Sequence, residues 1–282
     1  MSQFESWFHD KYEEKNGRTL SIKVDRILCR IHSPFQEICV VDTPAFGKML
    51  VNDGIIMLSE NDESAYHEMI SHVPLCVHPL PRDVLVIGGG DGGTVRELVK
   101  HFQVSSIDVC EIDQKVVAIC RKYFPKMTHG FDDPRTKIYN QDGAEFLKNR
   151  ENQYDIIIVD SSDPIGPGVT LFSKVFYQSL YRSLKPNGIA VTQMESLFWH
   201  AHFIREKFKF IQSIFPIVSY YYTMVPTYPS GMIGFSFCSR KYHPIDDFNP
   251  EVAQQLKNLN YYHTHIHQAA FVLPLFAQKI FS

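Results

Sequence analysis

The chain has 282 residues, of which 44% are hydrophobic and 21% charged, and its formal net charge is −3. This composition is typical of a globular protein with one large domain and a smaller companion, and the charge argues against nucleic acid as a partner. The apolar runs are too short to cross a bilayer, the first residues carry no targeting signal, and the six cysteines form no C-x-x-C pair. We therefore expect a cytoplasmic protein without a membrane partner, a disulfide or a zinc site.

Alternating apolar and polar residues characterise the N-terminal segment. The runs 20–25, 38–41 and 48–51 alternate with a period of two, and an Asn-Asp-Gly turn follows at 52–54. Runs of this period with turn residues between them predict a small antiparallel sheet. We assign this sheet to an N-terminal β domain over residues 1–62.

From residue 84 onwards, short runs rich in valine and isoleucine alternate with stretches of helical period. These runs lie at 84–87, 107–110, 154–159 and 188–192. Their alternation with helical stretches predicts an α/β fold in which helices wrap a mostly parallel, doubly wound sheet. Two later runs, 218–225 and 232–238, are joined by a Tyr-Pro-Ser-Gly turn, which adds an antiparallel hairpin. We assign this second domain to residues 63–282.

A glycine-rich loop, GGGDGG at 88–93, follows the first of these strands. Gly88, Gly90 and Gly93 satisfy the pattern G-x-G-x-x-G of a cofactor loop. Glu111 ends the next strand, where a carboxylate can accept hydrogen bonds from both hydroxyls of a ribose. The arrangement suits a nicotinamide dinucleotide or an adenosyl sulfonium. A glycine turn that only lets a strand pack close to a helix is the structural alternative.

Asp91, in the middle of this loop, separates the two cofactor classes. In a dinucleotide site the pyrophosphate lies on the loop amides. A carboxylate at ~4 Å from it would cost about 4 kcal/mol at an effective dielectric constant of ~20. The same carboxylate attracts a sulfonium or an ammonium group. Asp91 therefore predicts a cationic adenosyl ligand.

A second acidic position, Asp142-Gly143, follows a predicted strand. An aspartate there could accept a hydrogen bond from the amino group of adenine while a neighbouring backbone N–H donates to the ring. A simple Asp-Gly turn before a helix explains the pair equally well when it is taken alone. Its place after the glycine loop and Glu111 favours the adenosyl interpretation.

A third acidic segment, Asp160 to Asp163, directly follows the strand 154–159. Ligands of open parallel sheets bind beyond the carboxyl ends of the strands, so this loop should face the glycine loop. One carboxylate could take the proton of an attacking amine and another could anchor an ammonium. We assign Asp160 the first role and Asp163 the second. The alternatives are that Asp160 caps a turn and that Asp163 is a solvated loop acid.

Several long segments together resemble the spermidine synthases. They are SENDESAYHEMI at 59–70, GGGDGG at 88–93, DSSDPIGP at 160–167 and TYPSG at 227–231. The resemblance extends from about Trp7 to Pro274. It implies a methyltransferase-like fold and the transfer of an aminopropyl group from decarboxylated S-adenosylmethionine to putrescine, which yields spermidine and 5′-methylthioadenosine. It also implies a homodimer or homotetramer, with neither a metal nor a prosthetic group.

The resemblance further implies roles for individual residues. In the donor site, Asp91 holds the aminopropyl ammonium, and Gly88 and Gly90 belong to the cofactor-binding loop. The residues that surround the methylthioadenosine portion are Gln36, Glu111, Asp142, Gly143 and Pro167.

For the acceptor, the resemblance implies that Asp160 takes the proton while Tyr66 and Tyr228 orient the attacking nitrogen. The residues expected to line the diamine channel are His67, Asp163, Glu195 and Trp7. Position 67 is histidine here, whereas other members of the family carry glutamine, and this change would alter contacts with the acceptor.

Two other functions remain compatible with the sequence. The first is another enzyme on the same scaffold: a putrescine N-methyltransferase, or an aminopropyltransferase that prefers agmatine, cadaverine or spermidine. The second is a non-catalytic module that senses methylthioadenosine or a polyamine. His263, His265 and His267 alternate as ligands on a strand face do, but no cysteine or carboxylate cluster accompanies them, so we interpret them as surface histidines.

Overall fold

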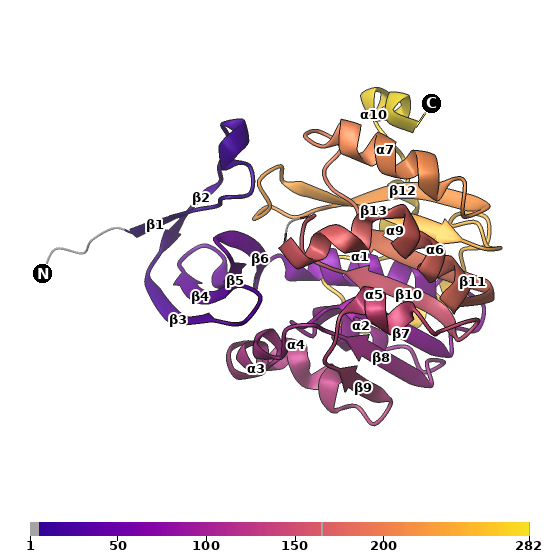
Figure 1. Ribbon diagram of the computed structural model, residues 1–282, viewed down its shortest axis with the longest axis horizontal. Coiled ribbons are helices and arrows are strands. Elements are labelled where there is room, and N and C mark those ends of the chain that lie inside the picture. The colour runs from indigo at the N-terminus through magenta and orange to yellow at the C-terminus, as the bar shows by residue number, and fades with distance from the viewer. Residues whose placement is uncertain (1–5, 165, 282) are drawn as a thin grey trace, which may run out of the picture.

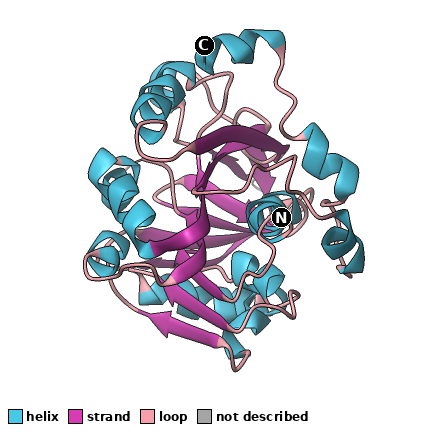
Figure 2. Cartoon of the chain, turned by 90° about the vertical axis from the view of Figure 1, so that its right-hand side faces the viewer, coloured by secondary structure: helices cyan, strands magenta, loops and turns pink. Residues whose placement is uncertain are grey.

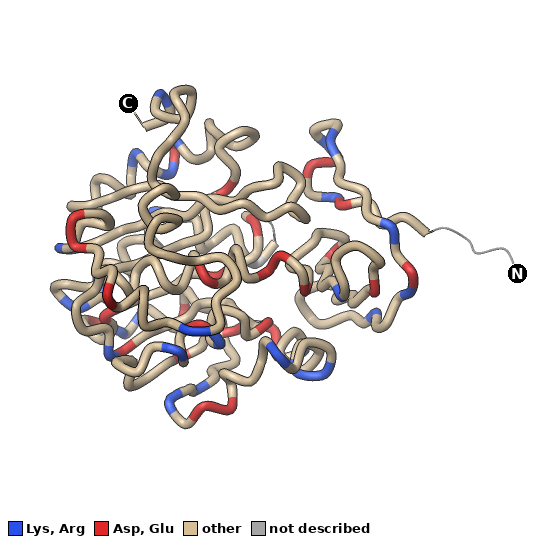
Figure 3. The backbone as a smooth tube through the Cα atoms, turned by 180° about the vertical axis from the view of Figure 1, so that it is seen from behind, with Lys and Arg blue, Asp and Glu red and all other residues tan. Residues whose placement is uncertain are grey.

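A β-rich N-terminal part and a larger α/β part make up the molecule (Figure 1). The computed structural model describes residues 6–164 and 166–281. Helix α1 (Glu63–Leu75) leads from the N-terminal strands into the larger part. Basic and acidic positions are interspersed along both parts (Figure 3). Within the described ranges, no helix combines the length and the apolar character of a membrane span.

Two antiparallel sheets form the N-terminal part, where the sequence predicts one. Strand β1 (Ser6–His9) pairs with β2 (Ser21–Val24), and a separate four-stranded sheet has the order β3-β4-β5-β6. The predicted runs fall in β2, β4 and β5, but β2 pairs with β1 instead of joining the others. The strands β3 to β6 span Arg26–His32, Glu37–Thr43, Gly47–Asn52 and Ile55–Ser59.

One face of the four-stranded sheet packs against helices of the larger part. Ile38, Leu50 and Leu58 are buried in a cluster with Val116 and Phe124. Val116 belongs to α3 (Gln114–Tyr123), and Phe124 is the C-cap of this helix. Because burial of apolar side chains is the main stabilising term in folding, this shared core holds the N-terminal sheet next to the central one.

The central sheet has seven strands in the order β12-β13-β11-β10-β7-β8-β9. Neighbours among β7 to β11 pair in parallel, whereas β13 pairs antiparallel with both β11 and β12. The predicted mostly parallel sheet with an antiparallel C-terminal hairpin is thus confirmed. From β7 to β13 the strands span Asp83–Gly88, Ser106–Cys110, Thr136–Tyr139, Tyr154–Asp160, Leu184–Gln193, Ile217–Met224 and Met232–Ser239.

Helices cover both faces of this sheet (Figure 2). Strand β10 is buried on each side: Ile156 and Ile158 belong to one hydrophobic cluster, whereas Ile157 and Val159 belong to another. Successive side chains of a strand point to opposite faces, so a continuous apolar run fits a strand with helices on both sides. From α2 to α10 the helices span Gly93–Leu98, Gln114–Tyr123, Pro125–Thr128, Gly143–Leu147, Lys174–Ser183, Ala201–Ile211, Pro250–Gln255, Thr264–Ala269 and Leu275–Phe281.

The C-terminal histidines do not all lie on the surface. Residues 264–269 form α9 rather than a strand. His263 and His265 are exposed, but His267 is fully buried, where it stacks on Phe248 and hydrogen-bonds the hydroxyl of Tyr262 at 2.8 Å. The prediction of surface histidines is therefore wrong for His267, because the helix turns this side chain into the protein.

Candidate active site

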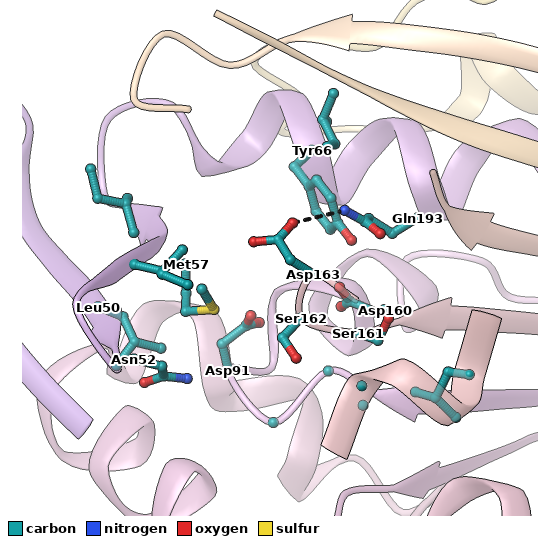
Figure 4. A pocket seen from close by; sticks show the side chains of 18 of the residues that line it. Leu50, Asn52, Met57, Tyr66, Asp91, Asp160, Ser161, Ser162, Asp163 and Gln193 are labelled. Carbon is teal, nitrogen blue, oxygen red and sulfur yellow. Dashed lines mark hydrogen bonds between the residues drawn. The ribbon is translucent and has the colours of Figure 1, made fainter. Parts of the chain in front are cut away.

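A cavity lies at the carboxyl ends of the central strands. Its wall includes the glycine loop after β7 and the acidic loop after β10. These two strands are neighbours, and the strand order reverses between them because β8 lies on the other side of β7. Open α/β sheets bind ligands at such a switch point. Leu50, Asn52 and Met57 of the N-terminal sheet line the cavity from the opposite side (Figure 4).

Two glycines allow the walls to approach each other. Gly88 has a φ of 82°, in the left-handed region that favours glycine. A Cβ at Gly88 would lie 2.0 Å from the carbonyl oxygen of Asp160, and one at Gly93 would lie 2.4 Å from the ring of His67. The loop therefore needs glycine at both positions to bring these two residues close to it.

Glu111, at the end of β8, is the acid expected to bind a ribose. Its carboxylate lines the cavity and accepts hydrogen bonds from the backbone N–H groups of Gly90 (3.2 Å) and Asp113 (2.8 Å). Burial raises the pKa of Glu111 to about 7. Gln36 also lines the cavity and donates to Asp113 at 3.1 Å, which connects the N-terminal part to this wall.

Asp142 and Gly143 line the same cavity. One carboxylate oxygen of Asp142 caps helix α5, because it accepts from the backbone N–H groups of Ala144 (2.8 Å) and Glu145 (2.9 Å). The alternative of an Asp-Gly turn before a helix is thus realised, and Asp142 nevertheless lines the cavity. The side chain of Pro167, predicted to lie near the adenosine, is outside the described part of the structure.

Three ionisable groups meet where the two loops face each other. One nitrogen or oxygen atom from each of His67, Asp91 and Asp160 lies within 4.8 Å of the other two. Nε2 of His67 is 3.3 Å from Oδ1 of Asp91, which also accepts from the N–H of Gly93 at 2.7 Å. A cation placed in this cluster would contact two carboxylates.

The surroundings of Asp91 and Asp160 set their pKa values apart. Burial and the charge of Asp91 raise the pKa of Asp160 to about 6, although the hydroxyl of Thr94 donates to it at 2.6 Å. Burial also acts to raise the pKa of Asp91, but the imidazole of His67 and the N–H of Gly93 lower it below its usual value. Neighbouring carboxyl groups with separated pKa values are typical of acid–base sites.

Two tyrosines and a further acid continue the cavity. Tyr66 extends from α1 toward the acidic loop that carries Asp160 (Figure 4). The ring of Tyr228 lies 6.3 Å from that of Tyr66. Asp163 accepts a hydrogen bond from Gln193 at 3.3 Å. Burial and the charge of Glu195 raise the pKa of Asp163 well above its usual value.

The far end of the cavity is formed by Tyr12, Glu195 and His200. The hydroxyl of Tyr12 donates to Glu195, and Nδ1 of His200 lies 2.9 Å from the other oxygen of this carboxylate. Nε2 of His200 is 2.7 Å from Glu13. Glu195 therefore lies in the predicted cavity, but it is already paired with groups that no sequence motif indicated.

Trp7 is absent from the cavity wall as far as the described residues define it. This residue lies on β1, and its side chain is 52% exposed. The aromatic side chains at the far end belong to Tyr12 and Trp199 instead. The displacement follows from the pairing of β1 with β2, which forms a two-stranded sheet of its own.

Several buried polar atoms of the cavity wall have no hydrogen-bond partner among the described residues. Apart from Nδ1 of His200, whose ion pair with Glu195 is described above, they are Oδ1 of Asn52, Oγ of Ser161 and Oε1 of Gln193. Buried polar atoms in proteins are nearly always hydrogen-bonded, so these three mark places where a polar ligand would bind. The sequence signals none of them, except that Ser161 follows Asp160 in the acidic loop.

Comparisons with known sequences agree with this geometry. The model of the spermine/spermidine synthase domain matches residues 63–249, and that of the spermidine synthase tetramerisation domain matches residues 6–60. A polyamine aminopropyltransferase of Leptospira biflexa is 46% identical over 97% of this chain and 97% of its own length. A spermidine synthase of Solanum lycopersicum is 46% identical over 97% and 83%. A spermine synthase of Arabidopsis thaliana is 44% identical over 93% and 76%.

Solved structures share the fold. The spermidine synthase of Thermotoga maritima has a TM-score of 0.94 at 39% identity, and the match covers 100% of this chain and 96% of that one. A spermidine synthase in complex with the transition-state analogue AdoDATO has a TM-score of 0.95 at 39% identity, with 100% and 97% covered. The predicted methyltransferase-like fold and the predicted resemblance are both confirmed.

Proposed function

Given that the chain belongs to the spermine/spermidine synthase family and is an aminopropyltransferase, we propose that it transfers the aminopropyl group of decarboxylated S-adenosylmethionine to putrescine. The products are spermidine and 5′-methylthioadenosine. The observation that carries this proposal is the cluster of Asp91, Asp160 and His67. It lies in the same cavity as Glu111 and Asp142, the residues expected to bind an adenosyl group. A carboxylate at the glycine loop suits a donor with positive charge on both its sulfur and its amine.

The donor binds along the glycine-loop side of the cavity. Glu111 accepts hydrogen bonds from the ribose hydroxyls, and Asp142 with the N–H of Gly143 recognises the adenine edge. Asp91 pairs with the aminopropyl ammonium. The same carboxylate repels the carboxylate of intact S-adenosylmethionine, since like charges in a buried site are weakly screened. Asp91 thereby favours the decarboxylated donor over the methyl donor.

The transfer is an in-line displacement at carbon. The lone pair of a neutral amine nitrogen forms a bond to the aminopropyl carbon next to sulfur, and the carbon–sulfur bond breaks with its electrons going to sulfur. The sulfonium thus leaves as a neutral thioether, which needs no metal to stabilise it. The new secondary ammonium keeps its own protons, but the attacking nitrogen, which is an ammonium at neutral pH, must first give up one proton to become neutral.

Asp160 takes this proton in the proposed mechanism. It is buried, it touches the hydroxyls of Thr94 and Tyr66, and its pKa of about 6 leaves it ionised at neutral pH. A group with a pKa near the working pH is an efficient general base. Tyr66 and Tyr228 orient the attacking nitrogen, and Asp163 anchors the other end of the diamine.

Another acceptor is the second candidate function. The family includes relatives named spermine synthase as well as spermidine synthase, and both match this chain over most of its length. Cadaverine and agmatine also carry the two cationic ends that the acidic cavity would bind. An N-methyltransferase is disfavoured by Asp91, because its donor retains the carboxylate.

A donor and acceptor panel tests the assignment. The purified protein is incubated with decarboxylated or intact S-adenosylmethionine and with putrescine, cadaverine, agmatine or spermidine, and the products are identified by mass spectrometry. We expect spermidine and methylthioadenosine from putrescine and the decarboxylated donor as the fastest reaction. N-methylputrescine as the main product, or no turnover with any pair, contradicts the proposal.

We also propose that the chain divides at residues 62 and 63 and that the N-terminal β domain mediates a homodimer or homotetramer. The match of residues 6–60 to a tetramerisation domain supports this assembly. Ile27 on β3, which is 54% exposed, and the partly buried Leu28, Cys29 and Ile31 beside it offer apolar surface for it. Light scattering of the intact chain distinguishes monomer, dimer and tetramer.

A further inference from the structure

His67 is held between two carboxylates where the donor ammonium would bind. Its side chain is 3% exposed, Nδ1 lies 2.6 Å from Oε2 of Glu63, and Nε2 lies 3.3 Å from Oδ1 of Asp91. An imidazole that meets a carboxylate at each nitrogen is stabilised in its cationic form. Burial acts to lower the pKa of His67, but Asp91 and Glu63 raise it well above its ordinary value.

Glu63 fixes the orientation of this ring. Its carboxylate accepts two hydrogen bonds from the guanidinium of Arg96, at 2.7 and 2.9 Å. Nε of Arg96 donates to Glu97 at 2.6 Å, so the guanidinium is itself held in place. Such bidentate pairs are geometrically rigid. Nδ1 of His67 therefore remains a donor to Glu63, and a proton lost by the ring comes from Nε2.

A cationic ring at this position competes with the donor for Asp91. In the free protein the imidazolium already neutralises the carboxylate that is proposed to hold the aminopropyl ammonium. Two cations beside one buried carboxylate repel each other, since charges in such a site are weakly screened. Loss of the Nε2 proton removes the repulsion and leaves a lone pair that accepts a hydrogen bond from the ammonium.

We propose, on the basis of the function proposed above, that His67 is a specificity-determining proton switch of the donor subsite. It supplies the positive charge beside Asp91 while the site is free, and it releases its Nε2 proton to solvent when the donor ammonium binds. No bond between heavy atoms forms or breaks, and one cation replaces another, so the charge of the subsite is conserved.

The charged groups around the ring are consistent with this exchange. Glu63 from α1 and Asp91 from the glycine loop contact it directly, and Asp160 at the end of β10 belongs to the same cluster. Arg96 of α2 is bound to Glu63 on the side away from Nε2. Tyr66 packs edge-on at 5.3 Å, and burial raises its pKa further above neutrality, so it stays uncharged. The ammonium therefore meets a second cation only if the ring keeps its proton.

Two unreactive ligands test the exchange. They are 5′-methylthioadenosine and the adenosine thioether that carries an aminopropyl group in place of the methyl. Calorimetric titration near neutral pH in phosphate and in Tris, which differ in ionisation enthalpy, gives the number of protons released by each ligand. We expect the aminopropyl thioether to release about one proton more than methylthioadenosine does. Its Kd should therefore fall by up to about tenfold for each unit by which the pH rises. Both ligands carry the ribose that Glu111 is proposed to bind, so any proton that Glu111 releases cancels when the two proton counts are subtracted.

Variants show whether His67 is the source of the proton. His67→Gln keeps a neutral group that can donate and accept, and we expect it to bind the aminopropyl thioether without the extra proton. Glu63→Gln, with its fold checked by circular dichroism, should release less than the wild type because the imidazolium loses a carboxylate partner. Equal proton release for the two ligands, or an unchanged difference in His67→Gln, would overturn the switch alone. Failure of the aminopropyl thioether to bind would overturn the proposed donor chemistry, and the switch with it.

Discussion

The two ends of the cavity are assembled in different ways. At the glycine-loop end, Asp160 is the last residue of a strand of the parallel sheet, and Asp91 and Glu111 lie just beyond two others, so short segments of sequence carry them. At the far end, Tyr12 bonds Glu195 over a separation of 183 positions, and His200 contacts Glu13 over 187. The first end follows from sheet topology, whereas the second depends on how the N-terminal part docks.

The two ends of the cavity also differ in the partners of their carboxyl groups and in the resulting pKa values. Asp91 has the imidazole of His67 beside it and keeps a lowered pKa. Glu195 is paired with Tyr12 and His200, which leaves Asp163 with a raised pKa and an amide as its hydrogen-bond partner. We expect the loop end to select the donor by charge and the far end to select the acceptor. Substitutions at either end can break or sharpen this division.

The largest effect is expected for Asp160→Asn. The amide cannot take the proton of the attacking ammonium, so kcat should fall by about 10²–10⁴-fold while the affinity for methylthioadenosine changes little. Steady-state kinetics and ligand titration measure the two quantities. Asp132→Asn is the matched control, because Asp132 is 71% exposed and pairs with Arg121 on the surface. Turnover of Asp160→Asn equal to that of the control would remove Asp160 from the mechanism.

A smaller but more selective loss is expected for Asp91→Asn. Truncation of one partner of a buried charge pair should lower kcat/KM for the decarboxylated donor by about 10²-fold. Binding of intact S-adenosylmethionine should improve in the same variant, because its carboxylate no longer meets a like charge. Competition titrations with both donors measure the change in preference. If the affinities for the decarboxylated and the intact donor are both unchanged, Asp91 does not select the donor by its charge.

The acceptor end is tested by Tyr12→Phe. The lost hydrogen bond to the Glu195 carboxylate should raise KM for the diamine by about tenfold, since bonds to charged groups contribute about 1.5–3 kcal/mol. KM for the donor should stay as in the wild type. Kinetics with each substrate varied in turn measure both constants. A larger effect on the donor than on the diamine would contradict the division between the two ends.

The same contrast explains what the sequence could predict. The apolar periods predicted the strands of the central sheet, and the loops behind them carried Gly88, Asp91, Glu111 and Asp160 to one edge. Placement of Trp7 in the cavity could not be corrected from sequence, because the pairing of β1 with β2 decides it. Unpartnered atoms such as Oδ1 of Asn52 depend on tertiary contacts for the same reason.

The smallest expected effect is a shift in pH dependence at the loop end. Asp160 must be ionised to act as a base, and burial raises its pKa to about 6, so below about pH 6 its protonation should add a further fall in kcat/KM for the donor to the dependence caused by His67. The imidazolium of His67 lowers this pKa and the charge of Asp91 raises it. His67→Gln should therefore remove the dependence on the His67 proton and move the remaining Asp160 limb to higher pH, whereas Asp91→Asn should move the Asp160 limb to lower pH, each shift being roughly one unit or less.

The pH profile of kcat provides a second readout of the same variants. It reports the complex rather than the free enzyme. If the donor ammonium has already displaced the Nε2 proton, His67 is neutral in the complex, and His67→Gln should leave the acid limb of kcat nearly unshifted. Profiles of kcat and kcat/KM that shift equally would show that the imidazolium persists beside the bound donor. The two ends of the cavity would then differ in their acids, but the loop end would hold a fixed cation rather than an exchangeable proton.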